Sequence, residues 1–448
     1  MNTPLYNKLI DYSAKNRISF AMPGHKGNVI PNLLRLDVTE LPQTADLHDE
    51  TDAVKAANDE LSRLYGTQKS YILTSGSTTA ILAMLLSCTR PGDTVLVSED
   101  CHMSVINACV LSGASIAVME KGFDDIFLIP TWTLEFEEYF KKYTNIKAVI
   151  ITSPSYYGIC EDVEKIYEVC KKHNALLLVD EAHGAHFISN PKFPKSAVNF
   201  ADMVCHSAHK TLKALTGAAY LHICSDRVDP QKVRRAINMV ETSSPSYPIA
   251  VSADIAREML CHQNREACIK KCRELSQKLS DLGIQVLSND DPTRLVINFK
   301  NFNMTGFYVS DMLSLHYGID VEMADMLNIV LIVTPYNIDT DFDELYNSLL
   351  KIIKTGDIKI TVPKIDKVKH NTLINPRDAY FSDSFDIDFK NSKGHISRAT
   401  VVAYPPGTPI IIIGERIGQQ QIDLTEKLKL YGAKIQGLND NKIEVVKE

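Results

Sequence analysis

The chain has 448 residues, of which 45% are hydrophobic and 23% charged, a composition typical of a soluble globular enzyme. Its length is too great for one ordinary core, so two or three domains are expected. The net charge of −7 and the absence of a basic stripe argue against a nucleic-acid or membrane-surface partner. Because the first twenty residues are charged and lack an apolar stretch, and because no apolar run approaches the roughly 20 residues of a membrane span, we expect a cytoplasmic protein without a signal peptide.

The ten cysteines lie mainly in apolar segments, so we expect them to be reduced core residues. Cys268 and Cys272 share a predicted helix face, with Cys261 and His262 shortly before them. A metal site there is the alternative interpretation. Since the chain has no CxxC pair, we expect no metal.

Continuous apolar strands alternate with helices through the first half of the chain. This alternation is typical of a largely parallel sheet that helices cover on both faces, an α/β fold. The expected helices are 53–65, 80–88, 102–111 and 162–173, and the expected strands are 70–73, 94–97, 115–119, 148–152, 175–179, 203–206 and, as an antiparallel partner, 218–222.

The character of the chain changes after a long predicted helix over 250–282. A small α+β segment follows, then a lysine-rich connection over 351–369, and then a tail with too many prolines for a helix bundle. In this second half we expect strands at 294–299, 329–334 and 410–413 and helices at 310–317 and 341–353. The predicted domains are 1–285 (an N-terminal arm and the large domain), 286–355 (small α+β) and 370–448 (C-terminal).

A lysine follows the buried strand 175–179 by about thirty positions. The strand leads into Asp180, and Lys210 closes the sequence Ser207-Ala208-His209-Lys210. A pyridoxal-phosphate enzyme needs this combination: a lysine amine for the Schiff base, an acid for the pyridinium nitrogen, and hydroxyl and imidazole groups that can reach the phosphate. Taken singly, a lysine is usually solvated and an acid at a strand end usually caps a loop. The combination favours the cofactor.

A run of small polar residues, Thr74-Ser75-Gly76-Ser77-Thr78, lies between a predicted strand and a predicted helix. Free backbone N–H groups and the helix dipole attract anions there, Gly76 permits close approach, and Ser75, Ser77 and Thr78 add hydroxyls. An ordinary N-cap is the alternative. No GK[ST] or GxGxxG pattern supports a nucleotide instead.

His102 follows the next strand, at the expected carboxyl edge of the sheet, where ligands bind in open α/β folds. An imidazole at this edge could stack on a flat cofactor ring. The alternative is a histidine that makes an ordinary hydrogen bond at a helix start.

Several motifs in order along residues 18–416 resemble the Orn/Lys/Arg decarboxylases, in a short form without an N-terminal regulator-like domain. The resemblance implies pyridoxal phosphate, the fold of the aspartate aminotransferases (PLP fold type I), and decarboxylation of arginine, lysine or ornithine to an amine related to polyamines. The seven-residue run Ala21–Gly27 is its most specific part. The motifs are Ala21-Met22-Pro23-Gly24-His25-Lys26-Gly27, Thr39-Glu40-Leu41-Pro42 with Asp46-Leu47-His48, Ser75-Gly76-Ser77-Thr78, Asp180-Glu181-Ala182-His183-Gly184, Ser207-Ala208-His209-Lys210, Thr242-Ser243-Ser244-Pro245-Ser246-Tyr247-Pro248, Gly318-Ile319-x-x-Glu322-Met323-Ala324-Asp325 and Tyr404-Pro405-Pro406-Gly407-Thr408-Pro409.

The resemblance also implies roles for individual residues. Lys210 would carry the cofactor, Asp180 would keep its ring nitrogen protonated, His102 would stack on the ring, and His183 would lie near the ring oxygen or the substrate. The phosphate ligands would be Ser75, Gly76, Ser77, Ser207 and His209, with Ser243 or Ser244 reaching the phosphate of a neighbouring subunit in a homodimer.

The chain departs from the family pattern at two places. Gln43-Thr44-Ala45 stands where relatives tend to have Gly-Leu-Asp, near the expected substrate entrance, so this departure bears on which amino acid is bound. Isoleucine stands where a proline usually precedes Gly414, a change within a strand that we expect to be silent. Glu415 is the acid we expect to bind the distal cation of the substrate. The alternatives are another reaction of the same cofactor, such as transamination or aldol cleavage, and a catalytically silent regulatory homologue.

Overall fold

The computed structural model of the chain describes most of the sequence with side chains. Parts of the motifs quoted above, namely 21–25, 27, 41–42 and 405–406, lie outside the described residues, as do the first 17 residues and 43–45. The described residues are 18–20, 26, 36–40, 46–50, 52–124, 126–132, 136–263, 265–355, 368–404 and 407–448.

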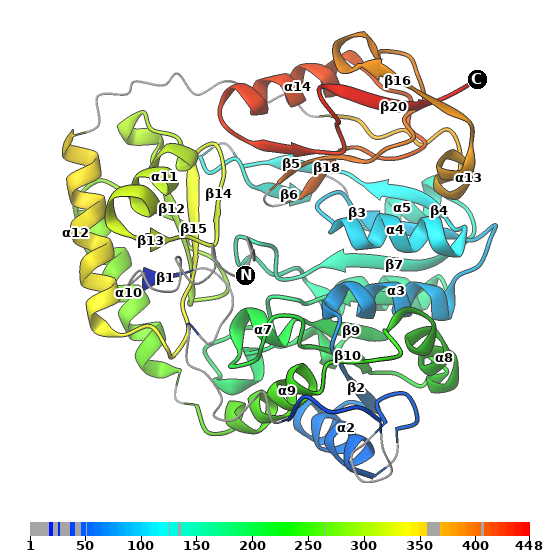
Figure 1. The fold of residues 1–448 in the computed structure, drawn as a ribbon, viewed down its shortest axis with the longest axis horizontal. Helices are drawn as coiled ribbons and strands as arrows, with labels where there is room; N and C mark the ends of the chain where they lie inside the picture. Colours follow the sequence, from blue (N-terminus) through cyan, green and yellow to red (C-terminus); the bar gives the residue numbers. More distant parts are fainter. Residues whose placement is uncertain are drawn as a thin grey trace, which may run out of the picture.

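A seven-stranded sheet forms the centre of the large domain, in the order β2-β10-β9-β8-β7-β3-β4 (Figure 1). Strand β10 runs antiparallel to both of its neighbours, whereas the pairs from β9 to β4 are parallel. The predicted mostly parallel α/β sheet and its antiparallel partner are confirmed. The strands are β2 (Lys69–Leu73), β3 (Thr94–Ser98), β4 (Ser115–Met119), β7 (Ile146–Thr152), β8 (Leu176–Asp180), β9 (Met203–His206) and β10 (Ala219–Ile223).

Helices pack on both faces of this sheet, which explains why its strands are apolar on both sides. One core cluster joins the sheet to α3, α4 and α8, and a second joins the other face to α2, α6 and α9. Helix α3 begins four residues earlier than predicted, because the Gly76-Ser77-Thr78 run forms its first turn. The helices are α2 (Asp52–Tyr65), α3 (Gly76–Cys88), α4 (Met103–Ser112), α5 (Phe136–Lys142), α6 (Val163–Lys172), α7 (Ala208–Thr211), α8 (Pro230–Val240) and α9 (Tyr247–Leu260).

The single long helix predicted over 250–282 is wrong. Helix α9 ends at Leu260, and a separate helix, α10 (Glu266–Asp281), follows. Arg265, at the N-cap of α10, is 1% exposed and donates to the carbonyl of Thr211 at 2.9 Å. At this break the cationic side chain of Arg265 points inward, beside the helix that carries Lys210. Helical periodicity in the sequence does not reveal such a tertiary contact.

A four-stranded antiparallel sheet, β11-β12-β15-β14, follows α10, with helices α10, α11 and α12 packed on its cluster of apolar residues. In Figure 1 this part lies at the left, with α12 outermost. The bounds are β11 (Gln285–Val286), β12 (Arg294–Asn298), β13 (Ile319–Asp320), β14 (Met323–Ala324), β15 (Asn328–Ile332), α11 (Gly306–Tyr317) and α12 (Asp339–Thr355). The short strand β1 (Ile18–Ser19) pairs in parallel with β13 and joins the start of the chain to this part.

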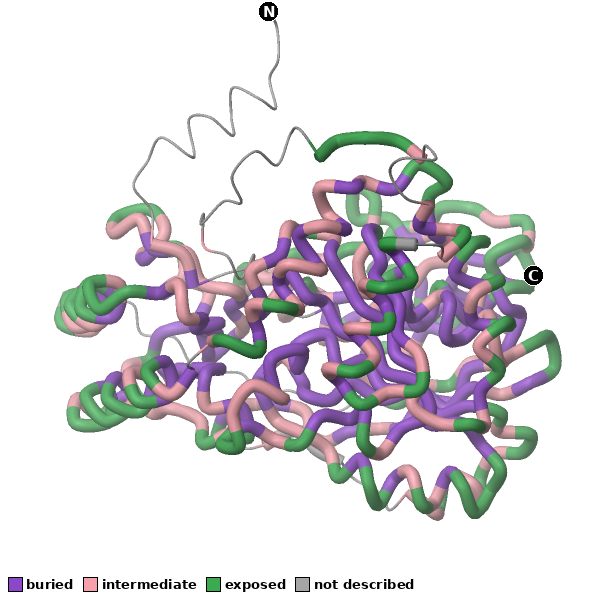
Figure 2. The backbone as a smooth tube through the Cα atoms, turned by 90° about the horizontal axis from the view of Figure 1, so that it is seen from below, coloured by how far each residue is buried: buried purple, intermediate pink, exposed green. Residues whose placement is uncertain are grey.

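The residues from 368 onward form a third, smaller core. It contains α13 (Pro376–Phe381), β16 (Ser384–Asp388), β17 (Val401–Tyr404), β18 (Thr408–Ile411), α14 (Gln419–Leu430), β19 (Lys434–Gln436) and β20 (Lys442–Val446). Figure 2 shows buried chain running through the large domain and exposed turns on the outer helices. The core of the small α+β part also includes Phe20 and residues of α10, which lie inside the predicted range 1–285. The domain boundaries remain a prediction. Among the helices that the structure describes, none is both long and apolar enough to cross a membrane.

The close approach of α11 to β15 yields a stability prediction. An added Cβ at Gly306, the first residue of α11, would lie 1.9 Å from the carbonyl oxygen of Asn328. Backbone atoms cannot rotate away as a side chain can, so Gly306→Ala should lower the free energy of unfolding by about 1–3 kcal/mol or more. Urea unfolding checks this. Gly418→Ala is the control, because its methyl would meet Gln421 Oε1 at an ordinary 3.5 Å; equal midpoints for the two variants would contradict the prediction.

Candidate active site

Asp180 ends strand β8, at the carboxyl edge of the parallel strands, and is 5% exposed. Its Oδ1 accepts hydrogen bonds from the backbone N–H of Ala182 at 3.1 Å and from the thiol of Cys205 at 3.5 Å. Within the described part of the chain, Oδ2 accepts none. One carboxylate oxygen is therefore left to receive a donor at this edge of the sheet.

Lys210 lies in the short helix α7, directly after strand β9. Its Nζ is 3.1 Å from His183 Nε2 and 5.4 Å from the centroid of the Tyr156 ring. Burial lowers the pKa of Lys210 below its ordinary value, and Arg294 lowers it further, against the opposite effects of Asp180 and Glu322. The amine is thus biased toward the neutral form, the one that attacks a carbonyl group.

His183 is the centre of a chain of contacts that reaches Lys210. Arg294 Nη2 is 3.0 Å from its Nδ1, and the Tyr156 ring lies tilted against it at 4.5 Å. Burial, followed by the charges of Lys210 and Arg294, holds the pKa of His183 well below its ordinary value. The structure therefore brings Lys210, Asp180 and His183 together, as the sequence predicts.

The predicted phosphate-binding residues meet at the start of α3. Ser207 Oγ, in front of α7, is 2.8 Å from Ser77 Oγ, in the first turn of α3. The first N–H groups of a helix have no partner within the helix, so this end of α3 combines backbone donors with two hydroxyls. Thr78 lies in the same turn and is exposed, and Gly76 has a φ of +79° with open space around its Cα.

The hydroxyl of Ser75 is engaged elsewhere. It donates at 2.5 Å to Oε1 of the buried Glu241, which also accepts from Thr74 Oγ1 at 2.8 Å. Ser75 consequently makes no side-chain cap on α3. Its hydroxyl could hold a phosphate only after leaving Glu241, so the backbone at Ser75 is the simpler donor.

His209 and His102 each combine a structural contact with the predicted place near the cofactor. Nδ1 of His209 is 2.9 Å from the carbonyl of Ala218, and burial lowers its pKa to about 4. His209 could therefore donate to a phosphate only after gaining a proton, which a dianion would favour. His102 caps α4 through Ser104, and burial lowers its pKa while the charges of Asp180 and Lys210 act on it. Its stacking role stays a prediction.

Ser243 and Ser244 are exposed in the loop between α8 and α9. Ser244 bonds to Thr242 through its backbone N–H and its hydroxyl. The loop follows Glu241 directly, and Glu241 contacts Ser75, so the loop begins beside the phosphate-binding turn of its own chain. Contact with the phosphate of a second subunit stays a prediction.

The contacts of Glu415 contradict its expected role at the substrate. Its carboxylate is fully buried in the C-terminal domain. Oε1 accepts from His370 Nδ1 at 2.9 Å and from the N–H of Asn371 at 3.0 Å, and Oε2 accepts from the N–H of Ile412 at 2.8 Å and Gln421 Nε2 at 3.1 Å. Both oxygens are satisfied, so none is left for a substrate. The motif places Glu415 in a tight turn before α14 instead.

Three charged residues of the site received no role from the sequence. Arg294 begins strand β12, Glu322 lies just before β14, and the charges of both act on Lys210. Lys26 lies near both of them: burial lowers its pKa to about 7, while Glu322 raises it and Arg294 lowers it. The sequence offered two signals for these residues. Arg294 stands directly before the apolar run Leu295–Ile297, and Lys26 and Glu322 are charged positions inside two recognised motifs.

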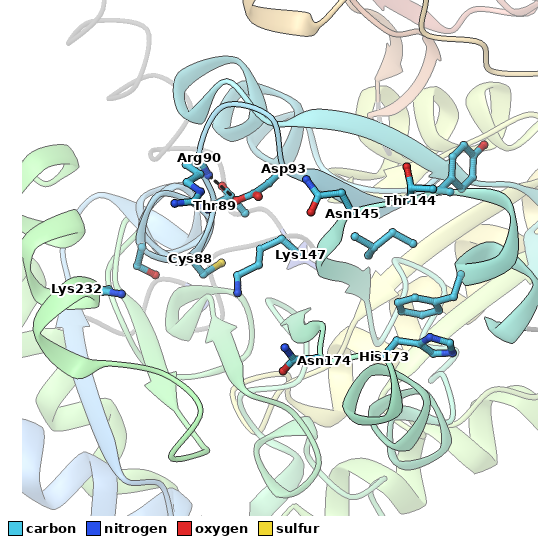
Figure 3. Close-up of a pocket in the computed structure, with 14 residues that line it drawn as sticks. Cys88, Thr89, Arg90, Asp93, Thr144, Asn145, Lys147, His173, Asn174 and Lys232 are labelled. Carbon is cyan, nitrogen blue, oxygen red and sulfur yellow. Dashed lines mark hydrogen bonds between the residues drawn. The ribbon is translucent and has the colours of Figure 1, made fainter.

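A hollow of about 920 Å³ lies elsewhere. It opens at the amino ends of β3 and β7 (Figure 3). Asp93, Asn145 and Lys147 line it, together with His173 at the end of α6. Because ligands of open α/β folds bind at the carboxyl ends of the strands, this hollow is on the wrong edge for the predicted cofactor.

The side chains at the carboxyl edge fit pyridoxal phosphate. They supply an amine biased toward its neutral form, a carboxylate with an unengaged oxygen, and a hydroxyl pair at a helix N-terminus. Lys210 would hold the carbonyl carbon, Asp180 the ring nitrogen, and Ser77 with Ser207 the phosphate. Among the described residues no cluster of three His, Cys, Asp or Glu side chains could hold a metal ion.

Comparison with known proteins identifies the family. Residues 3–289 match the major domain of the Orn/Lys/Arg decarboxylases. The chain is 34% identical to YaaO of Bacillus subtilis over 98% of this chain and 96% of that protein, and 29% identical to an arginine decarboxylase of Bacillus anthracis over 99% and 97%. The lysine decarboxylase LdcF of Francisella novicida has the same fold, with a TM-score of 0.80 at 19% identity over 99% of this chain and 81% of that one.

The match covers more than half of the chain and includes Asp180, His183 and Lys210, the residues that the structure brings together at the carboxyl edge of the sheet. The chain belongs to the Orn/Lys/Arg decarboxylase family and is a pyridoxal-phosphate-dependent decarboxylase.

Proposed function

We propose that the enzyme decarboxylates arginine, with lysine and ornithine as the related alternatives, and forms the corresponding amine. The observation that carries this proposal is the carboxylate of Glu322, whose charge acts on Lys210, Tyr156 and Lys26 at the candidate site. A cationic side chain needs such an acid once the Glu415 carboxylate is excluded. Four relatives named arginine decarboxylase, 28–29% identical over 96–100% of this chain, favour arginine.

The bound cofactor would supply the electron-withdrawing ring that accepts the electron pair of the breaking bond. The residues of the chain do the rest. Asp180 would keep a proton on the ring nitrogen through its unengaged oxygen, Ser77 and Ser207 would fix the phosphate end, and His102 would cover one face of the ring. Lys210 or His183 would return a proton to the substrate carbon.

Glu322 is placed to bind the guanidinium or ammonium end of the substrate. It is half-buried, so a cation paired with it is screened less than one at the surface. Tyr404 comes to the same region from the C-terminal domain: burial raises its pKa, Tyr156 and Glu322 raise it further, and Lys210 lowers it. Three parts of the chain thus contribute to the site.

The family match disfavours the two alternatives that the sequence left open. Another reaction of the same cofactor, transamination or aldol cleavage, would use the same Lys210 and Asp180. A silent regulatory homologue is disfavoured, because a chain released from catalysis has no reason to keep the amine and the carboxylate together. Release of CO2 separates the first alternative from the proposal, and a visible cofactor band separates the second.

We also propose a cytoplasmic homodimer with shared active sites, whose amine product serves polyamine synthesis. The exposed loop Thr242–Ser244, rich in hydroxyls and beside the phosphate-binding turn, is the segment expected to cross the two-fold axis.

Substrate preference tests the role of Glu322. CO2 release should be fastest with arginine, lysine or ornithine and roughly a hundredfold slower with citrulline, the neutral isostere of arginine, because a neutral side chain gains no charge attraction from the carboxylate of Glu322. Glu322→Gln should lower kcat/KM for the preferred substrate by about 10- to 100-fold and largely abolish the discrimination against citrulline. Glu344→Gln, on the exposed face of α12, is the matched control. Equal turnover of charged and neutral substrates by the wild type would rule out acidic recognition.

The ring-nitrogen role of Asp180 predicts a loss of rate without loss of cofactor. Asp180→Asn should still bind pyridoxal phosphate, as its visible absorbance would show, but should lose on the order of a hundredfold or more in kcat, since the amide carries no charge to hold the ring proton. Turnover near that of the wild type would remove this role.

Shared sites predict complementation between inactive subunits. Lys210→Ala should be inactive alone, and Ser243→Ala/Ser244→Ala should be strongly impaired. After mixing and subunit exchange, the two should recover part of the activity, because one hybrid site has both an intact lysine and an intact loop. Full activity in a monomeric fraction of the wild type would contradict the shared-site proposal.

A further inference from the structure

Arg294 is the most unusual charged residue near the site. It opens the fully buried strand β12, is 2% exposed, and extends to His183. Its Nη2 is 3.0 Å from His183 Nδ1, whereas Nε and Nη1 are buried and have no hydrogen-bond partner among the residues that the structure describes. Leaving charged donors unsatisfied costs about 1–3 kcal/mol or more, so the guanidinium is held here at the expense of stability.

The surrounding backbone fixes this position. An added Cβ at Gly158 would lie 2.8 Å from Arg294 Cβ, so the turn that contains Gly158 packs directly on the side chain. Asn289 holds the backbone of this turn in place, because its amide donates to the carbonyls of Tyr157 and Arg294 at 2.7 and 2.8 Å. The arginine is therefore aimed at His183 by packing.

The two hydrogen bonds of His183 admit one arrangement of protons. A guanidinium only donates, so Nδ1 of His183 must accept from Arg294. The proton of the neutral imidazole then lies on Nε2, which faces Lys210 Nζ at 3.1 Å. Nε2 donates, and the amine of Lys210 must accept through a lone pair, which only the neutral amine has.

We propose that Arg294 is a positioning residue that fixes the proton of His183 on Nε2, pointing at the amine of Lys210. The side chain of Arg294 bonds to His183, and among the described residues no hydrogen bond joins it to Lys210, so it acts through the imidazole. A histidine without this partner could carry its proton on either nitrogen or on both.

The electrostatics of the site agree with this arrangement. Arg294 lowers the pKa of both Lys210 and His183, after burial, so it disfavours a second cation in the chain of contacts. The charged and titratable groups that act on Lys210 or lie against it are Asp180 at the end of β8, Cys205 on β9, His102 before α4, Tyr156 and His183 in loops, His209 beside it, Arg294 on β12, Glu322 before β14 and Tyr404 on β17.

The arrangement gives His183 a proton at the atom that faces the lysine. For catalysis the inference rests on the proposed function: the Nε2 proton would be available where a proton must reach the substrate carbon or the departing lysine amine. For the resting protein the inference does not depend on the proposed function, because it concerns only which nitrogen of His183 is protonated and whether the amine of Lys210 is neutral.

A direct test is nitrogen NMR of the wild-type protein, freed of cofactor and labelled with ¹⁵N in its histidine rings. The signals of His183 are assigned by their loss in His183→Gln. At pH 7 we expect a protonated Nε2 and an unprotonated Nδ1. A protonated Nδ1, or an imidazolium, would overturn the proposal, and this result needs no variant of Arg294 to fold.

The second test measures, as a function of pH, the rate at which the cofactor-free protein captures pyridoxal phosphate. Borohydride trapping and peptide mass spectrometry show that Lys210 is the residue modified. Removing the cation in Arg294→Met should raise the pH at which the capture rate is half-maximal (the midpoint) by about one unit, and should slow capture at pH 7 by about tenfold relative to wild type. Arg294→Lys keeps a cation and a donor, so its midpoint should stay within about half a unit of wild type.

Two further variants make the test specific. Arg265→Met removes an equally buried arginine that bonds to Thr211 instead of His183, and it should leave the midpoint unchanged. His183→Gln should also keep the wild-type midpoint, because its amide oxygen can accept from Arg294 while its NH2 donates to Lys210, yet it should lose turnover. An unchanged midpoint in Arg294→Met, or an equal shift in Arg265→Met, would overturn the proposal. Absence of CO2 release together with the expected midpoints would instead overturn the proposed function.

Discussion

The desolvation of one lysine amine is the constraint on which the site depends. A lysine in water has a pKa near 10.4, so at pH 7 fewer than about one amine in a thousand is neutral and able to attack a carbonyl carbon. Lys210 is moved toward the neutral form by burial first and by the nearby Arg294 second. That burial requires a sheet covered on both faces, which the continuous apolar strands β7, β8 and β9 provide. The apolar core that stabilises the sheet therefore also lowers the pKa of the amine that the chemistry needs.

The same low-dielectric setting dictates how other buried charges are handled. Glu181 follows Asp180 in the chain and is buried, and burial raises its pKa to about 8. It accepts from Ser196 and from the N–H of Ala197, and it contacts His206, whose pKa burial lowers to about 3. These groups are joined by hydrogen bonds directly after the strand end, and the raised pKa of Glu181 disfavours a second anion next to Asp180.

A second buried cluster joins the C-terminal domain to the large domain, and in this one the groups are charged. Burial alone would lower the pKa of His370, but its contacts with Glu415 and Glu99 raise it to about 10. His370 is therefore a cation between a carboxylate of each domain. Glu99 lies directly after β3, three residues before His102. The acid that sequence reasoning assigned to the substrate instead anchors the domain that brings Tyr404 to the site.

The sequence was informative where local pattern and chemistry coincide. Apolar runs gave the strands of the large sheet, and an acid at a strand end followed by Ser-x-His-Lys gave Asp180 and Lys210, because the carboxyl ends of parallel strands share one edge. It failed where a contact joins distant segments. Arg265 interrupts the helix expected over 250–282 in order to reach Thr211, and Arg294 reaches His183 across 111 positions. Periodicity carries no information about such pairs. Hence Asp180 and Lys210 could be found in the large domain from sequence, whereas the roles that we propose for Arg294 and Glu322 rest on contacts with Lys210 and His183 that form only when the small part folds against the sheet.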